Sequence, residues 1–139
     1  MRGNEEGQVA PLALGLALVL FAVAGLAVDG TRAFLFRRTL QNAADAAALA
    51  GAGEVDRSTY YNSGGSEVVL DPGRATEVAF RWLRARGVAA ASGITSSSTR
   101  VSVTLKGTSP TLFLRLVGLQ QVSVGATAEA EPGLGGVPP

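Results

Sequence analysis

Residues 9–28 form an unbroken apolar run, VAPLALGLALVLFAVAGLAV, from which the organisation of the whole chain can be predicted. None of its twenty residues is charged. As an α-helix it would be roughly 30 Å long, which matches the hydrocarbon core of a bilayer. A helix buried in a soluble protein is rarely apolar on every side over such a length, so this run predicts a transmembrane helix. Pro11 is expected in its first turn, where the missing N–H removes no hydrogen bond.

The same run also has one feature of a secretory signal peptide. Ala22-Val23-Ala24 is a small-x-small sequence of the kind found at cleavage sites. However, the residues before the run contain one arginine, Arg2, and two acidic residues, Glu5 and Glu6, so they lack the positive charge typical of a signal peptide. The run also continues to Val28 without a polar break. We therefore expect a retained anchor, with cleavage after the second of these alanines as the alternative.

The composition of the 139-residue chain excludes several classes of function. The chain has no cysteine and no histidine, which removes disulfides, thiolate or imidazole metal sites and the nucleophile–base pairs built on either residue. Lys and Arg number 12 against 11 Asp and Glu, so no basic surface for nucleic acid is expected. We expect no cofactor, no bound metal and no small-molecule substrate.

Carboxylates are the remaining candidates for catalysis. Asp29 follows the apolar span, Asp45 lies on a helical segment, and Glu54, Asp56 and Glu67 fall in a glycine-rich segment. A catalytic carboxylate needs a pocket that shifts its pKa, and no nucleophile elbow, phosphate-binding loop or metal-ligand cluster accompanies these residues. The sequence therefore predicts that the protein is not an enzyme and has no catalytic residues.

The helical pattern continues beyond the span, from Asp29 to about Gly51, without a proline. The run QNAADAAALA consists of strong helix formers. The apolar residues at helical spacing form a narrow stripe of Phe36, Leu40, Ala43, Ala47 and Ala50. So thin a stripe stabilises an isolated helix very little, and we expect it to pack against a partner.

Two segments in this order carry a family resemblance: GLAVDG at residues 25–30 and RRTLQNAADAAALA at residues 37–50. With the preceding span they resemble the N-terminal part of TadE/TadG-like Flp (tight-adherence) pilus-assembly proteins, over roughly residues 6 to 53. The resemblance implies a membrane-anchored minor pilin-like or assembly component of an Flp/Tad-type pilus or a related secretion apparatus. Its partners would be the lipid bilayer and other pilin-like or pilus-assembly membrane proteins. The alternative is a secreted or membrane-tethered binding module unrelated to pili.

The family resemblance and the charges flanking the span predict opposite orientations. The resemblance implies a single-pass protein of the cell membrane whose C-terminal domain is extracytoplasmic. Three arginines follow the span within residues 32–38, and the positive-inside rule would place that flank in the cytoplasm. We follow the resemblance because it joins several features. Cleavage by a prepilin peptidase is not expected, since cutting after Gly3 or Gly7 leaves no Glu at the fifth mature position.

Five residues are candidates for contacts with partner subunits. They are Gly15, Ala22, Asp29, Gln41 and Asp45. The first three recur every seven residues, and small side chains at such spacing let a second helix approach closely. Asp29 is expected to pair with an arginine of a partner subunit or with Arg32 of its own chain, because an unpaired carboxylate at a membrane helix is costly. The alternative is that Asp29 only marks the membrane interface.

The rest of the chain predicts an α+β fold, in which a small domain of two or three strands and one or two helices follows the long N-terminal helix. One helix is expected to start with Asp71 as N-cap and Pro72 as its first residue, to end at Gly87, and to have Trp82 as the main core anchor. Alternating apolar residues predict strands in the segments Val101–Leu105 and Val122–Ala130.

The connections are less regular. A loop is expected at residues 54–73 with a short strand at 67–70, and a serine-rich turn at 92–99. Ser109-Pro110 is expected to open a helix-like run, TLFLRLVG, which packs under the sheet or near the bilayer; both parallel and antiparallel pairing stay open. The expected organisation is a tail at 1–8, a transmembrane helix at 9–28, a helical stalk at 29–53, a domain at 54–131 and a flexible tail at 132–139.

Overall fold

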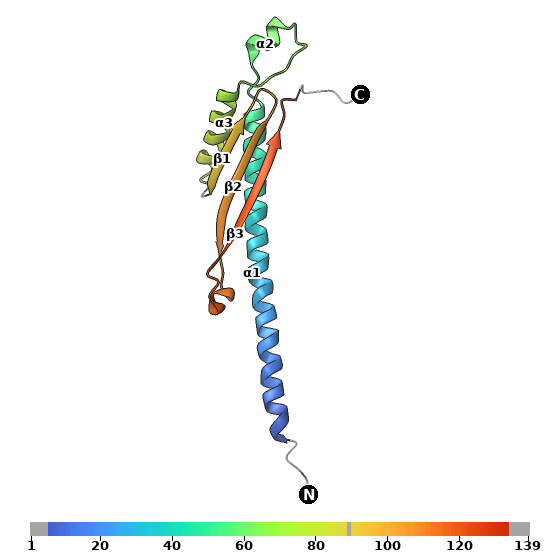
Figure 1. Cartoon of the computed structure of the whole chain (residues 1–139), viewed down its shortest axis with the longest axis vertical. Coiled ribbons are helices and arrows are strands. Elements are labelled where there is room, and N and C mark those ends of the chain that lie inside the picture. Colours follow the sequence, from blue (N-terminus) through green and yellow to red (C-terminus); the bar gives the residue numbers. More distant parts are fainter. Residues whose placement is uncertain (1–5, 89, 134–139) are drawn as a thin grey trace. The chain divides into compact units, whose positions relative to one another are not determined.

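The computed structural model describes residues 6–88 and 90–133, so most of the two expected tails lies outside the described residues. The elements are α1 (Glu6–Ala52), α2 (Arg57–Asn62), α3 (Pro72–Ala85), β1 (Ala91–Ser96), β2 (Val101–Pro110), the 3₁₀ turn η1 (Leu114–Val117) and β3 (Gln121–Ala130) (Figure 1). The expected α+β class is confirmed. The chain divides into a first unit of residues 1–35 with 108–122, and a second unit of residues 36–107 with 123–139.

Helix α1 joins the apolar run and the alanine-rich run in one continuous helix, as the sequence predicts. Its apolar part is long enough to cross a membrane. The helix begins at Glu6, so Pro11 lies inside it and not in its first turn as expected. A proline there costs one backbone hydrogen bond to the preceding turn.

The sheet of the second unit has the strand order β1-β2-β3 and is antiparallel. Strand β1 pairs with β2 from Ala91 opposite Lys106 to Ser96 opposite Val101. Every second side chain at the start of β2 is buried, namely Val101, Val103 and Leu105, as the alternation predicts. The question of parallel or antiparallel pairing is thereby answered.

The alanine stripe of α1 packs against the domain of its own chain. The buried core joins the C-terminal part of α1 to α3, β2 and β3, and its α1 members are Leu40, Ala44, Ala47, Ala48 and Ala52. A Cβ added to Gly51 would lie 2.8 Å from the carbonyl oxygen of Ala75, so α1 and α3 approach each other at backbone distance. Small side chains are what allow so close an approach.

Helix α3 begins as predicted, with the Asp71 carboxylate accepting from the amide of Arg74 and Pro72 in the first turn. The prediction for Trp82 is wrong. It is only partly buried at the edge of the core, with the Arg86 guanidinium 4.6 Å from its ring centre. The largest fully buried side chains are the three apolar residues of β2.

Three connections differ from expectation. The expected loop contains α2, whose N-cap Asp56 accepts hydrogen bonds from Ser58 and Thr59, and these bonds hold the pKa of its carboxyl below the ordinary value. The expected strand at 67–70 is reduced to one bridge between Val55 and Leu70. The expected serine-rich turn is mostly strand β1, which was missed because only one large apolar residue, Ile94, marks it.

Candidate functional site

The candidate site lies in the first unit, where the segment between β2 and β3 meets α1. We call residues 111–120 the 111–120 loop. Asp29 of α1 is 3% exposed, and its carboxylate accepts three backbone hydrogen bonds from this loop. The amide of Leu112 donates to Oδ1, and the amides of Phe113 and Leu114 both donate to Oδ2, each over 2.8 Å. Both carboxylate oxygens are therefore bound.

Asp29 has partners that the sequence did not predict. Within the chain, the positive charge of Arg32 acts on the carboxylate, and backbone amides at the start of η1 bind it directly. The reason is geometric: consecutive N–H groups at the start of a helical turn converge on one point and carry partial positive charge. The expected pairing with an arginine of a partner subunit stays a prediction.

Phe113 forms a second contact between the loop and α1. Its ring packs edge-on against Phe21, with ring centres 5.5 Å apart and planes at 72°. A Cβ added to Gly25 would lie 2.7 Å from both Cβ and Cγ of Phe113. The Phe113 side chain can therefore lie against α1 only because residue 25 is a glycine. Gly25 is one turn before Asp29 on the same side of the helix.

The loop also satisfies its own polar groups. Thr111 donates from its amide to Gln120 and from its hydroxyl to the carbonyl of Leu119. The amides of Leu116, Gly118 and Leu119 donate to carbonyls within the loop, and Gly118 takes a left-handed φ of 91° that closes η1. The expected helix-like run is therefore one short 3₁₀ turn, and Ser109-Pro110 belongs to the end of β2 and does not open a helix.

The other candidate residues fall into two groups. Gly15 and Ala22 are exposed on α1, and a Cβ on Gly15 would meet no atom within 4 Å. Gln41 and Asp45 have partners inside the second unit. The Gln41 amide donates to Asp45 Oδ1 over 3.0 Å and to the carbonyl of Thr127 on β3 over 3.1 Å. The contacts of these four residues with a partner subunit stay a prediction.

Sequence reasoning singled out Asp29 but missed Gly25, Phe113 and the amides of the loop. Gly25 was read as part of the end of the span, and nothing local shows that an aromatic ring rests on it. The signal for the loop was weak, since TLFLRLVG reads equally as a core helix.

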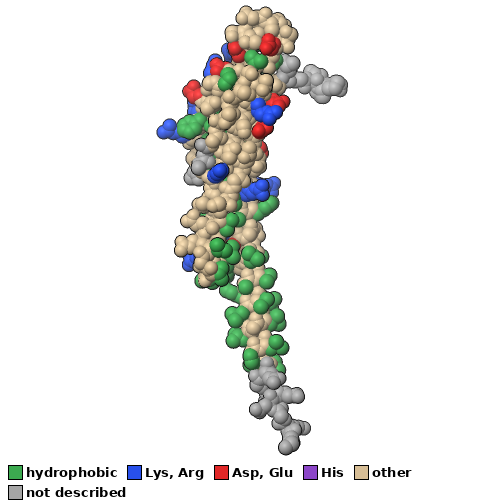
Figure 2. Space-filling model, viewed as in Figure 1, with side chains coloured by type: hydrophobic (Ala, Val, Ile, Leu, Met, Phe, Trp, Pro, Cys, Tyr) green, Lys and Arg blue, Asp and Glu red, His purple; other side chains and the backbone are tan. Residues whose placement is uncertain are grey.

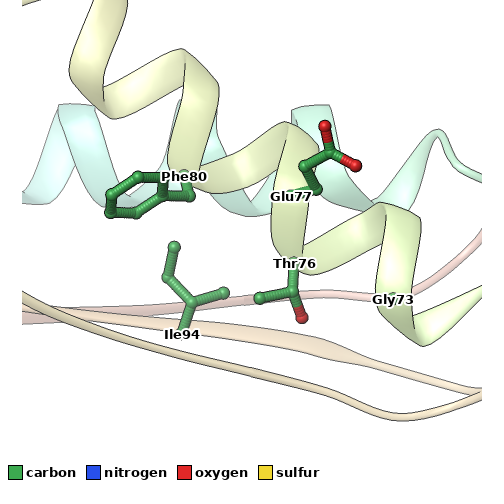
Figure 3. A pocket seen from close by; sticks show the side chains of 5 residues that line it. All are labelled: Gly73, Thr76, Glu77, Phe80 and Ile94. Carbon is green, nitrogen blue, oxygen red and sulfur yellow. The ribbon is translucent and has the colours of Figure 1, made fainter.

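A shallow hollow in the second unit, about 410 Å³, is a separate candidate (Figure 3). Phe80 of α3 and Ile94 of β1 face each other across it, with Thr76 and Glu77 nearby on α3. Its one carboxylate, Glu77, already pairs with Arg81. Over the described ranges 6–88 and 90–133, no three acidic side chains come together in a way that could hold a metal ion. This hollow offers no set of reacting groups.

Residues 7–54 match the model of the protein family described as "Putative Flp pilus-assembly TadE/G-like". The matched segment covers nearly all of α1, including Gly25 and Asp29, and stops before the rest of the domain. The description of that family names pilus assembly, and the matched segment contains the helix that is long enough to cross a membrane. No curated protein and no solved structure matches the chain.

Proposed function

We propose that this protein is a minor pilin-like or assembly component of an Flp/Tad-type pilus or a related secretion apparatus. Residues 9–28 anchor it in the cell membrane, and the domain that follows is extracytoplasmic. The observation that carries the proposal is the family match over residues 7–54, which joins the apolar span to the alanine-rich run. The protein acts by packing against other membrane proteins of the apparatus and not by catalysis.

The exposure of α1 supports one particular place for this packing. The alanine-rich face of α1 beyond Phe36 is already covered by the chain's own core. Residues 9–24 of the helix are all exposed, and Gly15 and Ala22 among them lie on the side that carries Asp29 further along. Small residues on an exposed membrane helix permit close approach of a second helix. We therefore place the helix–helix contact in residues 9–22.

A substitution pair tests the helix–helix contact. In the cell of origin, Gly15→Leu should abolish or strongly reduce pilus assembly, because a bulky side chain keeps the second helix away. Ala13→Leu is the matched control, since it adds similar bulk on the opposite side of α1 and should leave assembly unchanged. The measurement is the amount of surface pilus at equal protein level. Normal assembly by the Gly15 variant would contradict this contact.

A labelling experiment tests the orientation. The chain has no cysteine, so a single cysteine at the exposed Ser97 can be labelled specifically. A membrane-impermeant maleimide should modify it in intact cells. Modification only after permeabilisation would place the domain in the cytoplasm, as the arginine count suggests.

A further inference from the structure

The 111–120 loop presents apolar side chains that no part of its own unit covers. Leu116 and Val117 are 74% and 75% exposed, and Leu112 and Leu119 are also exposed. Hydrophobic side chains gather over this segment and over the N-terminal part of α1 in Figure 2. A soluble surface rarely exposes adjacent large apolar side chains on one short turn, so this group needs an apolar environment.

The contacts with α1 fix the height of the loop relative to the membrane span. Phe113 packs on Phe21, which lies inside the apolar run and about 12 Å before Asp29 along the helix axis. Gly25, on which the Phe113 ring also rests, lies inside the run too. If residues 9–28 cross the bilayer, the tip of the loop lies beside the helix at the depth of the outer part of the hydrocarbon core.

Most of the backbone amides of the loop have hydrogen-bond partners, which suits a lipid environment. Three of its amides donate to Asp29, and those of Thr111, Leu116, Gly118 and Leu119 donate within the loop. Backbone N–H groups without partners are costly in hydrocarbon, whereas water would satisfy them at no cost. The exposed Arg115 is the only charged residue of the loop, and its long side chain can reach the headgroups while its neighbours remain in lipid.

From these three observations we infer that the 111–120 loop is a second membrane contact, which inserts Leu112, Leu116, Val117 and Leu119 into the bilayer surface beside α1. The occupant of the apolar face is lipid, because the face is continuous with the apolar surface of the span itself. Asp29 thus has a positioning role: it holds the loop against the helix at the membrane surface. The inference rests on the membrane anchor and does not depend on the pilus.

Electron paramagnetic resonance of the full chain in vesicles of phosphatidylcholine and phosphatidylglycerol tests the insertion. Nitroxide labels are placed on Leu116→Cys and Val117→Cys, with Leu16→Cys as the reporter in the span and Ser97→Cys as the reporter in the second unit. Circular dichroism should show that all four variants keep the fold. Oxygen concentrates in hydrocarbon and a neutral nickel chelate in water, so the ratio of their collision rates reports depth.

We expect the oxygen-to-nickel ratio at Leu116 and Val117 to be several times that at Ser97 and closer to the ratio at Leu16. A high ratio at Leu16 with a water-like ratio at both loop positions would overturn the inference while leaving the anchor intact; the face would then be free for a protein partner. A water-like ratio at Leu16 as well would overturn the anchor and the inference together.

Discussion

Asp29 shows how one charged residue is accommodated at the end of an apolar span. A carboxylate there is expensive unless it is bound, and in this chain three amides bind it. Hydrogen bonds to a charged acceptor are roughly twice as strong as those between neutral groups, so the three amides stabilise the ionised carboxylate in this position. The residue therefore joins two segments that are more than eighty positions apart in the sequence.

We predict that Asp29→Asn loosens the 111–120 loop. An asparagine side chain has one acceptor oxygen and a donating NH₂, so at least one of the three amides loses its partner. A buried donor without a partner costs about 1–3 kcal/mol, and amide hydrogen exchange at Leu112 to Leu114 should rise by about tenfold to a hundredfold. Asp45→Asn is the control, because that exposed side chain can still accept from Gln41. Equal exchange rates of the Leu112 to Leu114 amides in the two variants would contradict the role of Asp29.

Gly25 has the opposite requirement, since the position tolerates no side chain. One of the atoms that an alanine Cβ would meet is Cβ of Phe113, which is fixed by the loop backbone, so rotation of the Phe113 ring cannot relieve the contact. Gly25→Ala should displace Phe113, separate its ring from Phe21 and raise exchange in the loop. Gly15→Ala meets no atom within 4 Å and should leave the loop unchanged. The measurement is again amide exchange, and matching profiles for the two variants would disprove the close contact.

At the scale of elements, the sequence predicted what depends on local pattern. Twenty uncharged apolar residues, an Asp-Pro start and the alternation in β2 are local signals, and α1, α3 and β2 follow them. Strand β1 was missed because it lies at the edge of the sheet and needs few apolar residues. Trp82 was misjudged because the core between α1 and α3 is built at backbone distance, which leaves no room for an indole at its centre.

The close packing of α1 in the second unit leaves no room for larger side chains on its buried face. Ala47 is fully buried in that core, so Ala47→Leu must push α1 away from its neighbours. Overpacking of this kind costs about 1–3 kcal/mol of unfolding free energy. Asn42→Leu, on an exposed position of the same helix, should stay within about 0.5 kcal/mol. Denaturant unfolding measures both, and an unchanged midpoint for Ala47→Leu would show that the core is not close-packed.

At the scale of the whole molecule, the site depends on long-range contacts that no local pattern reveals. The position of Asp29 after the span marked it as a residue that needs a partner, but its partners come from a segment that the sequence described only as apolar. The alanine stripe likewise required a partner without indicating whether that partner was another chain or the domain itself. The alanine stripe packs against the domain of its own chain, and Asp29 accepts hydrogen bonds from three amides of the 111–120 loop.

The second unit should fold without the membrane anchor. All of the buried hydrophobic core, from Leu40 to Ala130, lies in it, so a chain that starts at Phe36 should keep the core without the anchor. With Leu116→Ser and Val117→Ser to replace its two most exposed apolar loop residues, this chain should stay in solution without detergent and unfold cooperatively on heating, as followed by circular dichroism. The same chain with Val103→Asp should lose the cooperative transition, because a buried unpaired charge cannot be accommodated. A gradual transition without that substitution would mean that the core needs residues 1–35.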